Sequence, residues 1–128
     1  MSRDLERPVV DVPRGRGPQF LEITDLWVGE GDEAVKGSRV SVHYVGVAQS
    51  TGQEFDASWN RGEAFEFDLL AGQVIKGWDM GVKGMKVGGR RRLVIPAHLG
   101  YGDRGAGPAI RPGETLVFVV DLLDVKQP

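Results

Sequence analysis

The amino-acid sequence predicts an α+β domain in which an antiparallel sheet wraps around one short helix. Three observations lead to this fold class. Several short segments alternate apolar and polar residues, as half-buried strands do. One segment places apolar residues at helical spacing. The 19 glycines and seven prolines are spread along the chain, which is typical of short strands joined by tight turns.

Two segments in the first part of the chain have strand patterns. Residues 20–28 form the first expected strand, which ends in a glycine-containing turn. Within residues 39–48, Tyr44 shares a face with the apolar Val42, whereas His43 lies on the other face. Because successive side chains of a strand point to opposite sides of a sheet, we expect Tyr44 to face the core.

The middle of the chain adds two strands and the helix. Residues 54–57 form a short irregular strand, and residues 65–69 alternate as a half-buried strand does. Residues 75–85 form the expected helix, whose apolar stripe contains Trp78. Its glycines lower the helical propensity, so packing against the sheet must stabilise it.

The last part of the chain supplies two more strands. Residues 90–95 form one of them, and Pro96 stops it. Residues 96–99 are expected to form a single helical turn, and residues 100–113 form a loop rich in glycine and proline. Residues 115–125 are apolar on both faces, which indicates a central strand.

Length and charge limit the possible functions. A chain of 128 residues fits one domain, and a net charge of −2 gives no field of one sign that would attract nucleic acid or a membrane. No stretch approaches the roughly 20 apolar residues of a spanning helix, and the lack of cysteine suits a reducing compartment. We expect a soluble, cytoplasmic protein with a flexible arm at residues 1–19 and a folded domain at residues 20–128.

Common catalytic and metal-binding patterns are missing. His43 and His98 are not at metal-ligand spacing and no cysteine accompanies them, so we expect no metal or other cofactor. Nucleophile elbows and phosphate-binding loops are also missing. The basic run of residues 90–92 is interpreted as a solvated patch. An enzyme with this sequence would need chemistry without nucleophile or metal, and rotation about an X-Pro imide bond is such a reaction because no bond breaks.

Five ordered blocks carry a resemblance to a known family. They are Val42-His43-Tyr44-Val45-Gly46, Glu54-Phe55-Asp56-Ala57-Ser58, Phe65-Glu66-Phe67, Val74-Ile75-Lys76-Gly77-Trp78-Asp79-Met80-Gly81, and Tyr101-Gly102 followed by Thr115-Leu116-Val117-Phe118. In this order they resemble the FKBP-type peptidyl-prolyl cis-trans isomerases, rotamases and immunophilins that bind tacrolimus and rapamycin. The resemblance extends from about Phe20 to Val125, and it implies a curved antiparallel sheet of five to six strands around the helix, with residues 20–128 as the isomerase domain.

The resemblance also implies an aromatic pocket between helix and sheet. Carried over residue by residue, its catalytic residues are Tyr44, Asp56, Tyr101 and Phe118. Its substrate-binding residues are Phe55, Arg61, Phe65, Val74, Ile75, Trp78 and Ile110. Independently of the family, Trp78 offers the largest apolar surface for the floor of a proline-sized cavity, and Tyr101 lies in a loop, where core residues are unusual. The structural alternatives are ordinary core packing for the aromatic residues and an Asp56–Arg61 pair that only holds a loop.

The function implied by the resemblance is peptidyl-prolyl isomerisation in peptides and folding proteins. The protein would act as a monomer, without nucleic acid or membrane, and would bind macrolides such as tacrolimus and rapamycin. The alternative is a catalytically weak FKBP-like module that binds peptides or macrolides. Ala106 and Ala109 stand where many relatives carry histidine and a larger apolar residue, which implies a smaller pocket rim.

Overall fold

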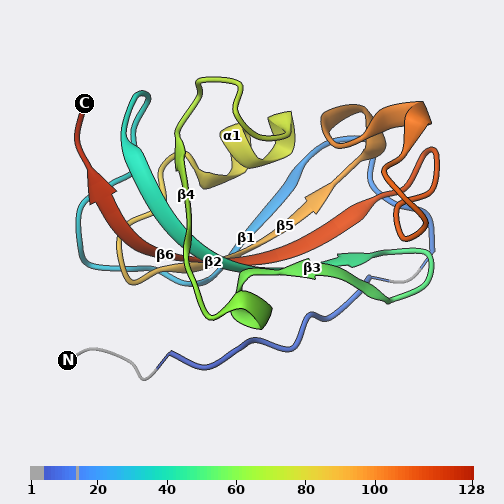
Figure 1. Ribbon diagram of the computed structural model, residues 1–128, viewed down its shortest axis with the longest axis horizontal. Helices are drawn as coiled ribbons and strands as arrows, with labels where there is room; N and C mark the ends of the chain where they lie inside the picture. Colours follow the sequence, from blue (N-terminus) through green and yellow to red (C-terminus); the bar gives the residue numbers. More distant parts are fainter. Residues whose placement is uncertain (1–4, 14) are drawn as a thin grey trace.

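The computed structural model describes residues 5–13 and 15–128. Its six strands form one curved antiparallel sheet with a single α-helix on one side (Figure 1), which confirms the predicted fold class. The strands are β1 (Glu22–Trp27), β2 (Arg39–Ala48), β3 (Glu54–Ala57), β4 (Phe65–Asp68), β5 (Arg90–Ile95) and β6 (Leu116–Lys126). The helical elements are α1 (Lys76–Val82) and the 3-10 turns η1 (Ser58–Arg61), η2 (Ala97–Leu99) and η3 (Gly102–Arg104).

The strands follow the order β1-β5-β6-β2, and β2 then pairs with two strands along its outer edge. The first half of β2 pairs with β4 and the second half with β3. At the junction, the N–H of Tyr44 donates to Ser58 Oγ over 2.7 Å. The fully buried Ser58 of η1 thus satisfies a backbone donor with its side chain, as buried backbone groups require.

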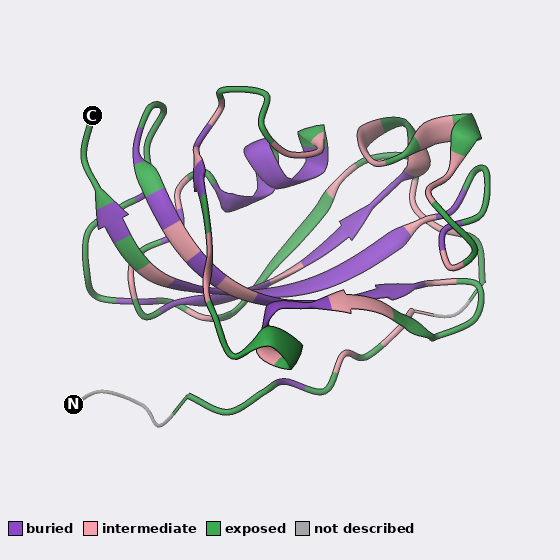
Figure 2. Ribbon diagram, in the orientation of Figure 1, coloured by how far each residue is buried: buried purple, intermediate pink, exposed green. Residues whose placement is uncertain are grey.

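The core lies between α1 and the concave face of the sheet. The central strands β2, β5 and β6 and the helix are mostly buried, whereas most loops are exposed (Figure 2). On this face Phe118 of β6 lies opposite Gly46 of β2 and Leu93 of β5. The central position predicted for the last strand is confirmed by its pairing with both β2 and β5.

Two glycines allow α1 to lie close to β5. A Cβ atom at Gly77 would lie 2.5 Å from Ile95 Cγ2, and one at Gly81 would lie 2.7 Å from both methyl carbons of Leu93. Distances this short do not occur between real side chains, so any larger residue would push the helix away from the sheet. The low helical propensity of this segment is therefore the cost of close packing.

The helix is shorter than the predicted residues 75–85. Lys83 has an extended backbone with ψ 131°, and Gly84 has a φ of +88°, so the chain leaves the helix after Val82. The spacing of apolar residues continues to Met85, which is 3% exposed, because the turn after the helix packs against the same core. Apolar spacing alone could not show where the helix ends.

The interpretation of residues 90–92 as a solvated patch is wrong for two of the three arginines. Arg90 is 8% exposed, and its Nε donates to Asp121 Oδ1 over 2.6 Å. Arg91 is 9% exposed, and its Nη1 donates to the carbonyl oxygens of Gly81 (2.8 Å) and Lys83 (3.0 Å). Arg91 therefore satisfies carbonyl groups that the end of α1 leaves without helical partners.

Residues 5–13 run along the face of the sheet opposite α1 (Figure 1). Pro8 is buried, and the half-buried Val10 and Val12 pack against an apolar patch formed by Val47, Val94 and Val117. We call residues 6–13 the strap, and the face that it crosses the convex face.

The flexibility predicted for residues 1–19, and the boundary of the folded domain at residue 20, stay predictions. Residues 1–4 and 14 lie outside the described residues. The described part of the chain contains no helix with the length and apolar character needed to cross a bilayer.

Candidate functional site

A cavity of about 520 Å³ lies between α1 and the concave face. It is lined by Tyr44, Asp56, Phe65, Gly72, Gln73, Val74, Ile75, Trp78, Tyr101 and Phe118. Eight of these ten residues are sequence-predicted site residues, contributed by β2, β3, β4, β6, α1 and the neighbouring loops. A second cavity, of about 590 Å³, is bordered by Trp27, Val87 and Asp121 and contains none of the predicted site residues.

Trp78 forms the floor of the cavity. Its ring meets Tyr44 at 4.9 Å and 82°, and Phe118 at 5.3 Å and 85°, in edge-to-face contacts that aromatic rings favour. Trp78 is 4% exposed, yet it lines the cavity. Its indole Nε1 is buried without a partner among the described residues. The ring contacts hold the indole in place beneath the cavity.

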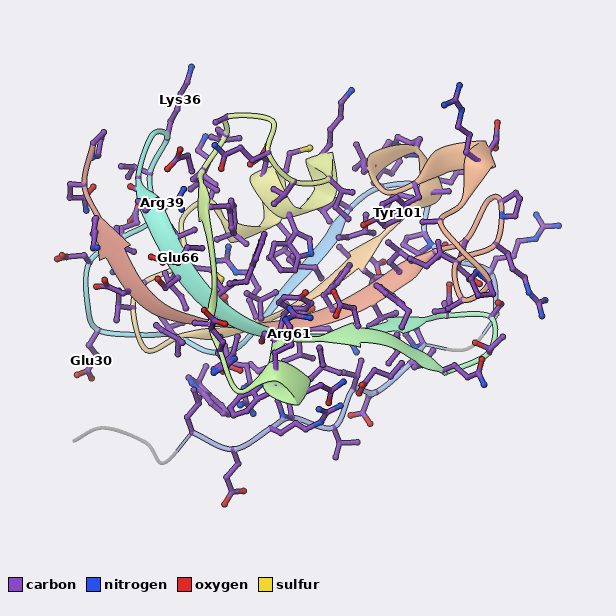
Figure 3. The ribbon with its side chains drawn as sticks, in the orientation of Figure 1. Glu30, Lys36, Arg39, Arg61, Glu66 and Tyr101 are labelled. Carbon is purple, nitrogen blue, oxygen red and sulfur yellow. The ribbon has the colours of Figure 1, made fainter. Side chains whose placement is uncertain are left out.

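Tyr101 stands at the rim of the cavity. It is 42% exposed and lies on the same side of the sheet as α1 (Figure 3). It directly precedes η3 in the loop between β5 and β6. Its hydroxyl can donate a hydrogen bond to a carbonyl group of a bound molecule.

Gly46 makes room for the aromatic wall of the cavity. A Cβ at Gly46 would lie 2.6 Å from Phe118 Cε1 and 2.7 Å from Phe55 Cζ. The two rings meet edge to face at 5.4 Å and 88°, directly over the glycine. Phe55 does not line the cavity itself, and it supports Phe118, which does.

Three polar side chains form a closed hydrogen-bonded triangle at one wall. Tyr44 Oη donates to Asp56 Oδ2 over 2.5 Å. Arg61 donates from Nη1 to Asp56 Oδ1 and from Nη2 to Tyr44 Oη, each over 2.8 Å. We call this set the Asp56 triangle. It fixes the carboxylate with charge-assisted hydrogen bonds.

The Asp56 triangle changes the acidity of its members. Burial raises the pKa of Asp56, but hydrogen bonds from Tyr44 and Arg61 outweigh burial and leave the pKa below its ordinary value of 3.8. Burial and the hydrogen bond to Asp56 raise the pKa of Tyr44. Hydrogen bonds with Tyr44 and Asp56 raise the pKa of Arg61. At neutral pH the site therefore holds a carboxylate, a protonated phenol and a guanidinium.

A β-bulge brings Asp56 to the cavity. On β2, Gly46 lies opposite Asp56, but the next residue, Val47, lies opposite Glu54. The register skips one residue of β3, so Glu54 and Asp56 are not held to one face as alternate strand residues normally are. Asp56 lines the cavity, whereas Glu54 contacts the strap on the convex face.

Three predicted site residues lie outside the cavity lining, namely Phe55, Arg61 and Ile110. Arg61 reaches the site through its hydrogen bonds to Tyr44 and Asp56. Ile110 is 6% exposed and belongs to the main core. Ile110 therefore packs within the core and is not part of the cavity wall.

Gly72 and Gln73 line the cavity and were not predicted. Their loop is held by the buried Asp79 of α1, which accepts hydrogen bonds from the N–H of Leu70 (2.8 Å) and of Gly72 (3.3 Å). Leu70 has a φ of +62°, a conformation that non-glycine residues rarely adopt. The available sequence signal was an aspartate on the helix between apolar neighbours.

No group of at least three histidine, cysteine or acidic residues in the described ranges is arranged to hold a metal ion. The site combines an aromatic floor and wall with a rim hydroxyl and a fixed carboxylate. It can bind and orient a small, partly apolar group, and it can act on that group through shape and electric field.

Comparison with known proteins agrees with this geometry. The FKBP-type peptidyl-prolyl cis-trans isomerase family matches residues 31–123. The chain is 66% identical over 122 residues to the "FK506-binding protein" of Streptomyces anulatus, covering 94% of this chain and 98% of that protein. It is 50% identical over 119 residues to the "Probable FK506-binding protein" of Corynebacterium glutamicum, covering 93% and 98%. The crystal structure of AtFKBP13 superposes with a TM-score of 0.76 at 43% identity, covering 84% of this chain and 94% of that one.

Proposed function

Because the chain belongs to the family of FKBP-type peptidyl-prolyl cis-trans isomerases, we propose that its aromatic cavity binds an X-Pro segment and carries the isomerase reaction. The observation that supports this most is the cavity itself, with the apolar Trp78 as its floor and the exposed Tyr101 at its rim. A proline ring fits on the indole, and the preceding imide then lies near the rim. Residues 20–128 form the isomerase domain in this proposal.

The reaction needs little chemical machinery. The rotation barrier of a peptide bond is about 18–20 kcal/mol, and a millionfold acceleration requires roughly 8 kcal/mol of preferential binding to the transition state. A twisted imide has less charge separation than a planar one, so a dry apolar cavity favours the twisted form relative to the planar one. A cavity shaped for the twisted form adds to this preference.

Each site residue has a proposed role. Tyr101 and the backbone N–H of Ile75 orient the peptide by donating hydrogen bonds to its carbonyl groups. Asp56, held by Tyr44 and Arg61, acts on the twisted imide through its charge. Phe118 forms the apolar wall. The binding surface is completed by Phe65, Val74 and Trp78. Phe55 and Ile110 support this surface from behind.

The same cavity is the proposed site for macrolides. Its volume of about 520 Å³ lies within the range of small-molecule pockets, and the Streptomyces anulatus relative is an FK506-binding protein by name. Tacrolimus and rapamycin should therefore compete with proline peptides and folding proteins. We further propose that the protein acts as a monomer. We place it in the cytoplasm, because a chain without cysteine suits a reducing compartment.

A protease-coupled isomerisation assay with a proline peptide tests the proposal. We expect turnover that tacrolimus inhibits competitively. Asp56→Ala should lower kcat/KM by roughly tenfold, which corresponds to about 1.4 kcal/mol of lost transition-state stabilisation. Met80→Ala is the matched control, since Met80 lies on α1 and is 49% exposed. Tight tacrolimus binding without turnover would instead identify a binding module without isomerase activity.

A further inference from the structure

The strap is held to the convex face at both of its ends. Near its start, the carbonyl oxygen of Glu6 accepts a hydrogen bond from Arg90 Nη2 over 2.6 Å. At its other end, the carbonyl oxygen of Pro13 accepts one from Gln49 Nε2 over 2.9 Å. Pro8 is buried between these anchors. The strap therefore passes over the sheet on a defined path.

Arg7 extends from the strap to β3 and η1. Its Nη2 forms an ion pair with Glu54 Oε1, and its Nη1 donates to Asn60 Oδ1 over 2.7 Å. Asn60 Nδ2 in turn donates to Glu54 Oε2 over 3.0 Å. These three side chains form a second closed triangle, the Arg7 triangle, on the side of the sheet away from the cavity.

Both triangles draw residues from the same short segment, β3 and the following turn η1. Glu54 lies two residues before Asp56 on β3, and Asn60 directly precedes Arg61 in η1. Arg61 is the residue that donates to both Asp56 and Tyr44. The Arg7 triangle therefore ties the start of β3 to η1, which are the segments that carry the carboxylate and the guanidinium of the Asp56 triangle.

We propose that Arg7 is a positioning residue for the isomerase site, acting through Glu54 and Asn60 on Asp56 and Arg61. This inference rests on the proposed function of the cavity. Without Arg7, the β3–η1 segment loses its outer brace, and Arg61 holds the carboxylate less often in the geometry that acts on the imide. A planar guanidinium can reach both partners at once, which a single point charge does less well.

Because the Arg7 triangle is partly exposed, a positioning role can be told apart from a role in stability. The side chains of Arg7 and Glu54 are 38% and 33% exposed. Exposed ion pairs contribute little to the free energy of unfolding. Loss of Arg7 should therefore change catalysis while leaving the midpoint of thermal unfolding almost unchanged.

The test measures kcat/KM and the unfolding midpoint of the full chain carrying Arg7→Gln. We expect kcat/KM to fall roughly threefold, the size of effect that residues in one contact network commonly have on each other. Arg16→Gln is the matched control, because Arg16 is exposed on the same arm and has no ion pair within the described residues. It removes the same charge and should leave kcat/KM unchanged.

A double-mutant cycle completes the test. In an Arg61→Ala background, Arg7→Gln should have no further effect on kcat/KM, because the contact through which Arg7 acts is already lost. Equal losses in both backgrounds, or an Arg7→Gln effect no larger than that of Arg16→Gln, would overturn the positioning role alone. A wild-type chain without turnover would overturn the proposed function itself, so the two failures are distinguishable.

Discussion

The carboxylate of Asp56 governs how the site should respond to acid. Hydrogen bonds from Tyr44 and Arg61 keep its pKa below 3.8 despite burial. Because the pKa of Asp56 is lower in the folded than in the unfolded protein, the ionised carboxylate stabilises the fold at pH values above the unfolded pKa. This stabilisation is lost only as the pH falls through the lower pKa of the folded protein. We therefore expect kcat/KM to show no Asp56 titration between about pH 5 and 8.

Measurement of kcat/KM against pH for the wild type and for Asp56→Asn checks this expectation. The asparagine variant is the control, since it keeps the shape of the side chain and cannot titrate. An inflection in the wild-type profile that is missing from the variant would contradict the depressed pKa.

Single residues differed in how far the sequence could place them. Strand alternation placed Tyr44 on the inner face, where it lines the cavity with Trp78 and Phe118. Gly72 and Gln73 could not be placed in this way. Their loop conformation depends on hydrogen bonds to Asp79, from a different element, and local sequence patterns do not report such contacts.

At the scale of elements, the close packing of α1 on β5 predicts that a substitution favoured by helix propensity will destabilise the protein. Gly81→Ala gains about 1 kcal/mol of propensity. The new methyl group, however, would enter the space of Leu93, and overpacking of this kind costs about 1–3 kcal/mol. We expect the free energy of unfolding to fall, as measured by urea denaturation. Met80→Ala on the exposed side of the same helix is the comparison, and a Gly81→Ala variant more stable than wild type would refute close packing.

The strap makes a second prediction at this scale. Val9 is 89% exposed, whereas Val10 packs against the convex face. The chain has no cysteine, so Val9→Cys and Val10→Cys each introduce a single thiol. If the strap is docked in solution, the thiol at residue 10 should react at least roughly tenfold more slowly with a soluble maleimide. Equal rates would instead support the flexible arm that the sequence predicts.

Element boundaries show why the sequence was only partly informative. Alternating patterns, apolar runs and glycine-bounded segments placed all six strands within a few residues. The bulge in β3 and the contacts of Arg90 and Arg91 were not predictable in this way. The bulge arises in the pairing of β3 with β2, and the two arginines contact Asp121 and the end of α1. Contacts between elements are not encoded in local sequence patterns.

At the scale of the whole molecule, the cavity is assembled from residues 44 to 118, from both outer and central strands and from the helix. A ligand in it should therefore stabilise the entire domain as one cooperative unit. At 100 times its Kd, tacrolimus should add about 2.7 kcal/mol to the free energy of unfolding. Thermal unfolding at increasing tacrolimus concentration measures this. An unchanged midpoint at concentrations that inhibit turnover would argue against binding in the cavity.

The division of the outer edge of β2 between β3 and β4 also bears on association between molecules. Each of these edge strands has only four residues, and η1 separates them. Short, interrupted edges are poor templates for a strand from another chain. Concentrated solutions of the protein should accordingly resist sheet-extending aggregation along this side.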